Sequence, residues 1–123
     1  MQSLGKVLVT GGAGFIGTEL VEQLYIKGYE VTILDKQDKP MGLDHVKYIK
    51  GDLSSPARCV MACAGQDYVI HLAAKARIPE SFINPDEYFD SNVVGSRNIL
   101  TAASAVGVRK FVYAGSSSVY GNN

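Results

Sequence analysis

Residues 10–17, with the sequence TGGAGFIG, constrain the fold more than any other part of the chain. They follow a short apolar run and open a helix-patterned run over residues 18–27. A strand that turns through glycines into a helix is typical of a phosphate-binding turn, because the helix N-terminus favours an anion. Here Gly11 permits a tight turn, Gly14 lets backbone N–H groups approach a pyrophosphate, and Gly17 lets the helix lie close to the strand. The spacing G-x-x-G-x-x-G differs from the G-x-G-x-x-G of most dehydrogenases, so the remaining sequence has to supply the context.

Strand and helix patterns alternate along the chain, with no sign of a hairpin. This order predicts the α/β class: a Rossmann-type, doubly wound parallel sheet of about five strands in the order 3-2-1-4-5, with a ligand between strands 1 and 4. The expected strands are residues 5–10, 30–35, 46–49, 67–72 and 109–113. The expected helices run from Gly14 to about Gly28, over residues 55–64 and over residues 85–106. The first of them carries Phe15, Ile16, Leu20, Val21 and Leu24 at helical spacing.

Composition narrows the class of protein. The chain of 123 residues suits one domain, and its formal net charge of +0 offers no attraction to nucleic acid or to an anionic membrane. No apolar run approaches the ~20 residues of a membrane span, and no secretory signal is visible. Cys59 and Cys63 lack the neighbours of a metal site and are expected on a buried apolar face. We therefore expect a cytoplasmic protein with reduced thiols and no metal site.

Two carboxylates stand where strands of the predicted sheet end. Asp35 closes the second strand about 20 residues after the glycine turn, where a carboxylate accepts the hydroxyls of an adenosine ribose. It would repel a 2′-phosphate, which favours NAD over NADP, although the adjacent Lys36 weakens that preference. Alternatively, Asp35 only opens a turn. Asp52 follows the third strand and either accepts from the adenine amino group or, like Ser54, caps the next helix.

Small and polar residues follow the fourth strand. Ala73 and Ala74 would let the chain pass close under a flat ligand, and Arg77 and Ser81 lie in an expected loop that could reach a substrate. His71 has no partner visible in the sequence, so we interpret it as a core histidine with satisfied hydrogen bonds. Asn92 lies within the longest helical pattern, where a buried amide must find partners. It either braces the sheet or serves the site.

Together these motifs resemble the extended short-chain dehydrogenase/reductase superfamily. Within it, the chain is similar to the NAD-dependent sugar-nucleotide epimerase/dehydratase family, which includes UDP-glucose 4-epimerase. The resemblance covers essentially the whole chain. It rests on TGGAGFIG at residues 10–17, Asp35, GDL at 51–53, HLAA at 71–74, NVVGSRNIL at 92–100 and SSSVYG at 116–121.

The resemblance assigns roles to individual residues. The pyrophosphate would lie on Gly11, Gly14, Phe15, Ile16 and Gly17, the ribose on Asp35, the adenine on Asp52 and Leu53, and the middle of NAD on Leu72, Ala73, Ala74, Lys75, Ser91 and Asn92. Ser116, four residues before Tyr120, stands where the family has its active-site serine or threonine. With Arg77, Ser81, Ser117 and Ser118 it would face a UDP-sugar. In this family hydride passes transiently from sugar C4 to the nicotinamide.

One family motif is missing. The family's base is a tyrosine in Y-x-x-x-K, and none of the 7 tyrosines has a lysine four residues later. The sequence therefore predicts a truncated, incomplete NAD-binding domain over residues 1–123, inactive by itself, whose fifth strand has an open edge and which self-associates or forms a homodimer. Two alternatives stay open: a non-catalytic dinucleotide-binding module or regulator, and a chain that folds but binds no nucleotide well.

Overall fold

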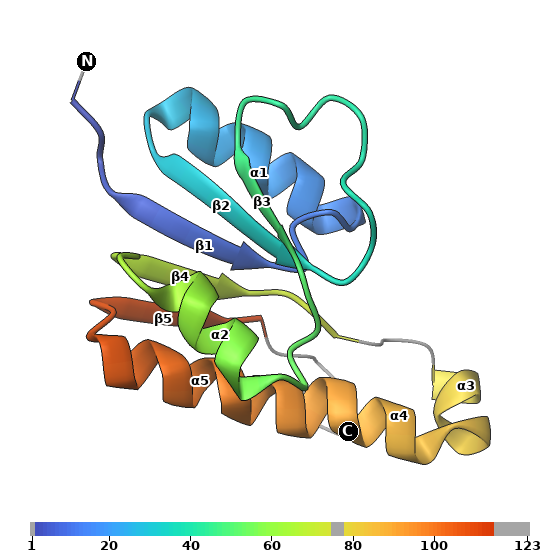
Figure 1. Ribbon diagram of the computed structural model, residues 1–123. Coiled ribbons are helices and arrows are strands. Elements are labelled where there is room, and N and C mark those ends of the chain that lie inside the picture. Colours follow the sequence, from blue (N-terminus) through green and yellow to red (C-terminus); the bar gives the residue numbers. More distant parts are fainter. Residues whose placement is uncertain (1, 75–77, 115–123) are drawn as a thin grey trace, which may run out of the picture.

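The computed structural model describes residues 2–74 and 78–114 and shows the predicted parallel sheet. Five strands lie in the order β3-β2-β1-β4-β5 (Figure 1), so the predicted fold class and strand order are confirmed. The strands are β1 (Lys6–Thr10), β2 (Glu30–Asp35), β3 (Lys47–Lys50), β4 (Tyr68–His71) and β5 (Lys110–Tyr113). The helical segments are α1 (Phe15–Lys27), α2 (Pro56–Cys63), α3 (Ile78–Ile83), α4 (Pro85–Phe89), η1 (Asp90–Val94) and α5 (Gly95–Val106).

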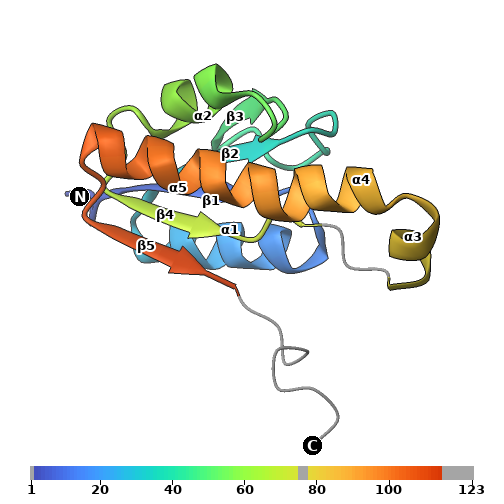
Figure 2. The same cartoon turned by 90° about the horizontal axis from the view of Figure 1, so that it is seen from below.

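Helices cover both faces of the sheet. Figure 2 shows α1 on one face and α2 with α5 on the other. The central strand β1 serves both layers, because successive side chains point to opposite faces. Leu8 packs in the cluster under α2 and α5, whereas Val7 and Val9 pack in the cluster under α1. The sheet is thus buried on both faces, as its continuous apolar strands predict.

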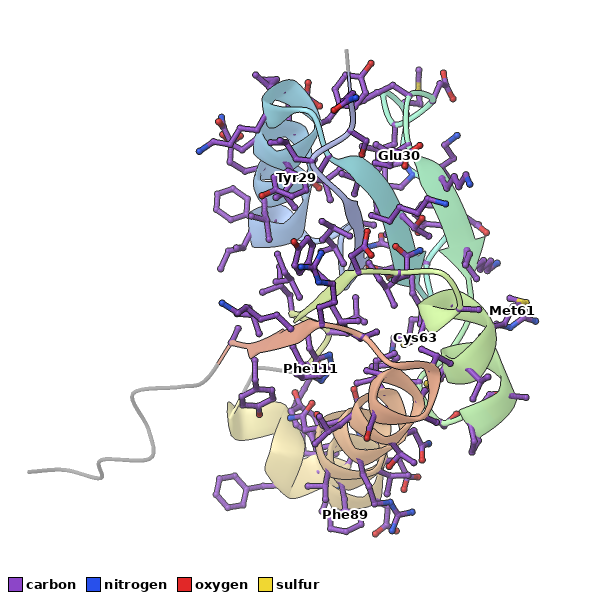
Figure 3. All side chains as sticks on the ribbon, turned by 90° about the vertical axis from the view of Figure 1, so that its left-hand side faces the viewer. Tyr29, Glu30, Met61, Cys63, Phe89 and Phe111 are labelled. Atoms are coloured by element: carbon purple, nitrogen blue, oxygen red, sulfur yellow. The ribbon has the colours of Figure 1, made fainter. Side chains whose placement is uncertain are left out.

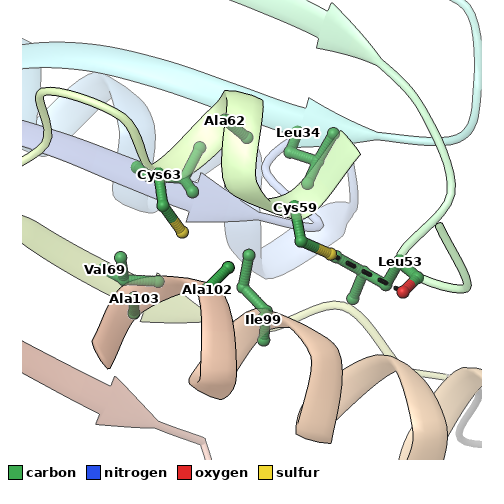
Figure 4. Packing of buried hydrophobic residues seen from close by; sticks show 10 residues of the cluster. Leu34, Leu53, Cys59, Ala62, Cys63, Val69, Ile99, Ala102 and Ala103 are labelled. Carbon is green, nitrogen blue, oxygen red and sulfur yellow. Dashed lines mark hydrogen bonds between the residues drawn. The ribbon is translucent and has the colours of Figure 1, made fainter. Parts of the chain in front are cut away.

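The cluster under α2 and α5 contains both cysteines. Cys59 and Cys63 are free thiols and fully buried, as expected (Figure 4). Cys63 lies between the two helices, whereas Phe89 of α4 points into solvent (Figure 3). Burial raises the pKa of both thiols to about 11, so they stay protonated at neutral pH. The thiols therefore act as small apolar core groups.

The first helix buries less of its apolar pattern than the sequence predicts. Val21 is fully buried and Leu20 packs partly against the same cluster. Phe15 and Ile16, which share this helical spacing, are 97% and 70% exposed and are not part of the core. They lie in the first turn of α1, which begins beyond the carboxyl end of β1. The helix ends as predicted at Gly28, whose φ of 104° is left-handed.

The long helical pattern over residues 85–106 is not one uniform helix. It divides into α4, the π-helical turn η1 and α5, which run on as one rod (Figure 2). A π turn accommodates one additional residue and changes which face the later residues present. Gly95 follows this turn, and a Cβ there would lie 3.0 Å from Cβ of Leu53. A side chain at position 95 would therefore be tight, and Leu53 in the loop after β3 would have to shift to accommodate it.

Three further details differ from the expectations. Ser81 lies in the helix α3 rather than in a loop, and Arg77 lies outside the described residues. Neither Asp52 nor Ser54 caps α2: the cap is Ser55, whose Oγ accepts from the amide of Arg58 at 3.2 Å. The third strand, β3, begins and ends one residue later than the expected range 46–49. Within residues 2–74 and 78–114, no helix is long and apolar enough to cross a membrane.

Candidate functional site

A cavity of about 280 Å³ opens where β1, β2 and β4 end. These are the carboxyl ends of the central strands, where doubly wound sheets bind ligands. The cavity is formed by segments that are far apart in the sequence. Its lining residues are Gly11, Gly14, Leu34, Asp35, Lys36, Gln37, Gly51, Asp52, Leu53, Leu72, Ala73, Ala74 and Ser91.

Most of the predicted cofactor residues meet in this cavity, from Gly11 and Asp35 to Leu72 and Ser91. The cavity lining does not include Phe15, Ile16, Gly17 and Asn92: the first three follow Gly14 in the first turn of α1, and Asn92 follows Ser91 in η1. Lys75, Arg77, Ser116, Ser117, Ser118 and Tyr120, together with the side chain of Ser81, lie outside the described residues. The structure therefore describes the nucleotide part of the predicted site, and the predicted roles stay predictions.

The glycine turn is packed too closely for side chains at Gly11, Gly12 and Gly17. Gly11 has a φ of +73°, and a Cβ there would lie 2.8 Å from Cα and N of Ala73. At Gly17 a Cβ would overlap the carbonyl of Gly11 and lie 2.7 Å from Cα of Gly12. Gly14 is different, since its Cβ would meet only the carbonyl oxygen of Gly11 at 3.3 Å. The absence of a side chain at Gly14 therefore keeps space free in the cavity, whereas Gly11 and Gly17 are needed for close packing within the protein.

The start of α1 presents hydrogen-bond donors at the cavity. The cap residue Gly14 is extended and supplies no side chain. The first amides of any helix lack acceptors within the helix and carry the positive end of its dipole. In α1 these amides belong to Phe15, Ile16 and Gly17. This arrangement suits a phosphate group at the turn.

Asp35 ties the end of β2 to the glycine turn. Its Oδ2 accepts from the amide of Ala13 at 3.2 Å, and its Oδ1 accepts from the amide of Gln37 at 3.1 Å. A carboxylate has about four acceptor positions, so two further hydroxyl groups can be accepted from the cavity. Asp35 is therefore both a turn residue and a ribose-binding candidate, which unites the two sequence interpretations.

The loop after β3 forms another wall. Asp52 Oδ1 accepts from the amide of Ser54 at 2.9 Å, and the carbonyl of Leu53 accepts from Asn98 Nδ2 at 2.8 Å. The Sγ of Cys59 also donates to this carbonyl, at 3.6 Å. The two bonds to the carbonyl of Leu53 tie the loop to α5 and α2. No hydrogen bond within the described residues occupies the second carboxylate oxygen of Asp52, so this oxygen suits an adenine amino group.

His71 is a buried histidine with satisfied hydrogen bonds, as the sequence interpretation expected. The residue is 2% exposed, and its Nδ1 and Nε2 lie 2.6 Å from Thr10 Oγ1 and 2.8 Å from Ser96 Oγ. Burial lowers the pKa of His71 to about 4, so the ring is neutral at physiological pH. This neutral ring does not line the cavity, but its partner Thr10 lies directly before the glycine turn.

Several residues of the site were missed by sequence reasoning. Leu34 and Gln37 line the cavity, and their position beside Asp35 and Lys36 was the available signal. Gly51 also lines it, and a Cβ there would lie 2.5 Å from Cγ of Arg58. At Gly12 a Cβ would lie 2.8 Å from Cγ1 of Ile33. These two close approaches depend on tertiary contacts, so no local pattern announces them.

Comparison with known proteins identifies the family. Residues 7–123 match the NAD dependent epimerase/dehydratase family. The chain belongs to this family. The fold, with its glycine turn and the carboxylate after β2, is what the family resemblance implied.

Relatives show how much of such a protein the chain represents. It is 36% identical to the UDP-glucose 4-epimerase of Klebsiella pneumoniae, with 95% of the chain and 93% of that sequence covered. It is 38% identical to the 3-beta-hydroxysteroid dehydrogenase of Mycolicibacterium neoaurum, with 94% of the chain but 33% of that protein covered. The structure of MoeE5 in complex with UDP-glucose and NAD aligns with a TM-score of 0.88 at 39% identity, over 97% of the chain and 39% of MoeE5. The chain thus spans only 33% and 39% of the latter two proteins.

Proposed function

We propose that the chain binds NAD as the cofactor-binding part of a sugar-nucleotide epimerase or dehydratase. The observation that carries the proposal is one cavity that joins the glycine turn, the N-terminus of α1 and Asp35. Family membership supports it, because the family is NAD-dependent. The cradle fits the cofactor: Gly14 leaves the phosphate position open, and the carboxylate of Asp35 has acceptor positions to spare.

The chain's residues would divide the cofactor between them. Gly11 and Gly14, with the amides of Phe15, Ile16 and Gly17, would hold the pyrophosphate. Asp35 would accept the ribose hydroxyls, and Asp52 and Leu53 would contact the adenine. Leu72, Ala73, Ala74 and Ser91 would line the path toward the nicotinamide, which supplies a hydride acceptor when bound. We propose the same path for Lys75 and Asn92.

Charge at the ribose position distinguishes NAD from NADP. The carboxylate of Asp35 would lie close to a 2′-phosphate. Two like charges about 4 Å apart repel by about 1–4 kcal/mol, depending on the effective dielectric constant. Lys36 also lines the cavity and offsets part of this repulsion. We therefore expect NAD to bind about tenfold more tightly than NADP.

Calorimetric titration of the chain with NAD and with NADP tests the proposal. We expect the chain to bind NAD saturably. Asp35→Asn should raise the NAD dissociation constant about tenfold, because it removes the charged acceptor of the ribose hydroxyls. It should also reduce the difference in affinity between NAD and NADP. Asp44→Asn is the matched control, because Asp44 pairs with Lys39 at 3.2 Å on the surface, where such pairs contribute little. An affinity equal in Asp35→Asn and the original chain would refute the assignment of Asp35. The absence of binding at millimolar NAD would refute the function itself.

The activity of the whole protein is a further proposal. MoeE5 binds UDP-glucose and the Klebsiella relative is a UDP-glucose 4-epimerase, so we propose a UDP-sugar as substrate, oxidised transiently at C4. Ser116 would contact the sugar 4-hydroxyl, with Arg77, Ser81, Ser117 and Ser118 toward the substrate. The steroid dehydrogenase relative supports a second candidate, oxidation of a hydroxyl on an apolar ring system. A mixture of UDP-glucose, UDP-galactose and NAD incubated with the chain should show no turnover, whereas turnover would refute its predicted inactivity.

Self-association is also proposed rather than observed. β5 is the outer strand of the sheet next to β4, and exposed strand edges promote pairing between chains. Light scattering should show dimers or larger species as concentration rises. A monomer at all concentrations would contradict this expectation. The cytoplasmic location is proposed on the sequence grounds given above.

A further inference from the structure

Thr10 stands at the end of β1, directly before the glycine turn, and its side chain serves two backbone amides. Its Oγ1 accepts from the amide of Leu72 at 3.1 Å and from the amide of Ala73 at 3.2 Å. The amide of Leu72 is shared with the carbonyl of Thr10, at 3.0 Å, whereas the bond from Ala73 goes to the hydroxyl oxygen. A hydroxyl oxygen has two acceptor positions, so these amides fill both. The hydroxyl proton must therefore be donated to another group.

That acceptor is Nδ1 of His71, 2.6 Å from Thr10 Oγ1. A neutral imidazole that accepts at Nδ1 carries its proton on Nε2. Nε2 lies 2.8 Å from Ser96 Oγ, and this hydroxyl donates to the carbonyl of Asn92 at 2.6 Å. All bonds then run in one direction, from the amides through Thr10, His71 and Ser96 to Asn92. The opposite tautomer would leave the Thr10 proton without an acceptor and would take the Ser96 proton away from Asn92.

The environment of the ring keeps it in the neutral state that this chain of bonds requires. His71 is 2% exposed, and the rings of Phe111 and Tyr113 on β5 flank it at 6.1 and 5.7 Å between centroids. Apolar surroundings disfavour the charged imidazolium. The protonated form would also have to donate from Nδ1, which Thr10 Oγ1 cannot accept while it holds both amides.

We propose that His71, as its Nε2–H tautomer, is a positioning residue for the nucleotide cavity. It fixes the hydroxyl of Thr10 so that this oxygen holds the amides of Leu72 and Ala73, two residues that line the cavity. Ala73 is also the residue against which Gly11 packs. At its other end the same chain of bonds reaches Asn92 in η1, next to Ser91 on another wall of the cavity. His71 therefore couples the floor of the cavity to the π turn without touching a ligand. The binding consequence rests on the proposed NAD function, whereas the tautomer does not.

The first experiment determines the tautomer in the unliganded chain. Two-bond proton–nitrogen correlation spectra of the uniformly ¹⁵N-labelled chain separate a protonated from an unprotonated ring nitrogen. We expect a protonated Nε2 and an unprotonated Nδ1 for His71, unchanged between neutral pH and mild acid. The other histidine, His45, is the internal control, since it is exposed enough to pair with Glu22 on the surface. A protonated Nδ1, or an even mixture of tautomers for His71, would overturn the proposal whether or not the chain binds NAD.

The second experiment connects the tautomer to the cavity. Thr10→Val keeps the branched shape but removes the hydroxyl, so the amide of Ala73 loses its acceptor. We expect the NAD dissociation constant to rise about tenfold and the His71 nitrogen signals to shift, whereas Thr10→Ser should restore both. Thr32→Val is the matched control, a buried threonine of β2 outside this chain of bonds, and should change neither. Equal affinity in Thr10→Val and the original chain would refute the coupling.

A third variant decides the case if Thr10→Val does not fold. Ser96→Ala removes the acceptor of Nε2–H from the surface of α5 and leaves Thr10 in place. We expect the Nε2–H tautomer of His71 to persist, because Thr10 still donates to Nδ1, and NAD binding to weaken by a smaller factor than in Thr10→Val. A switch of His71 to the Nδ1–H tautomer in Ser96→Ala would overturn the proposal that Thr10 fixes the ring, and an NAD affinity equal to that of the original chain would refute the coupling through Ser96. If the original chain shows the Nε2–H tautomer but binds no NAD, the proposed direction of the hydrogen bonds is upheld and the proposed function is refuted.

Discussion

Replacing Gly11 by alanine should destabilise the chain through two separable effects. An alanine at a φ of +73° adopts the left-handed region at a cost of roughly 1–2 kcal/mol. Its Cβ would also lie 2.8 Å from Cα and N of Ala73, and these atoms are backbone of the segment directly after β4, so they cannot rotate away as a side chain would. Overpacking of this kind costs about 1–3 kcal/mol. We therefore expect Gly11→Ala to lose about 2–5 kcal/mol in the free energy of unfolding.

Gly42→Ala separates the two effects. Gly42 has a φ of +87°, but nothing lies within 4 Å of its Cβ position. It should lose only the conformational part, about 1–2 kcal/mol. Urea unfolding followed by circular dichroism gives both free energies, on a total of about 6–18 kcal/mol for 123 residues. The close approach of Gly11 to Ala73 would be refuted if the two variants lost the same amount.

Three further predictions concern side chains behind the cavity. Burial lowers the pKa of His71 from 6.5 to about 4, so between these pH values the unfolded chain binds a proton that the folded chain does not. The free energy of unfolding should therefore be unaffected by this group above pH 6.5 and should fall by about 3 kcal/mol as the pH falls to 4. Unfolding curves of His71→Gln should therefore depend less on pH across this window. The thiols of Cys59 and Cys63, with pKa values of about 11, should react with a thiol reagent at pH 8 only as fast as the chain opens. Asn98→Ala should lose about 1 kcal/mol with the bond to the carbonyl of Leu53, and a stability equal to the original would show that this bond contributes nothing.

The sheet and the nucleotide half of the site could be predicted because their signals are local. Strand ends, the glycine turn and Asp35 lie in short segments whose periodicity and residue types indicate their own conformation. Strand order followed from the doubly wound fold that the alternation of strands and helices and the glycine turn together indicated. Once the order was fixed, the carboxyl ends of the strands had to meet. Asp35 and Leu72 therefore line one cavity although they are remote in sequence.

What sequence reasoning missed depends on contacts between remote elements. The hydrophobic spacing of α1 does not distinguish Val21, which is buried, from Phe15 and Ile16, which are exposed in the first turn. The partners of His71 come from β1 and α5, and neither stands near it in the sequence. The acceptor of a buried imidazole is defined only when the strands are placed side by side. For the same reason, Gly51 and Gly12 show their steric role only in the folded chain.

The π turn explains why the long helix could not be one uniform α-helix. In an α-helix, residues seven apart lie within about 20° of one face, so Tyr88 and Gly95 would both face the sheet. The structure directs them differently: Tyr88 donates to Glu80 Oε2 of α3 at 2.9 Å, whereas Gly95 packs against Leu53. One additional residue in η1 shifts the phase by about 100° and satisfies both contacts. It also sets the phase of α5, from which Ser96 and Asn98 reach β4 and the loop after β3. Because of the π turn, the continuous helical segment can contact α3 through Tyr88 and, on another face, contact β4 and the loop after β3 through α5.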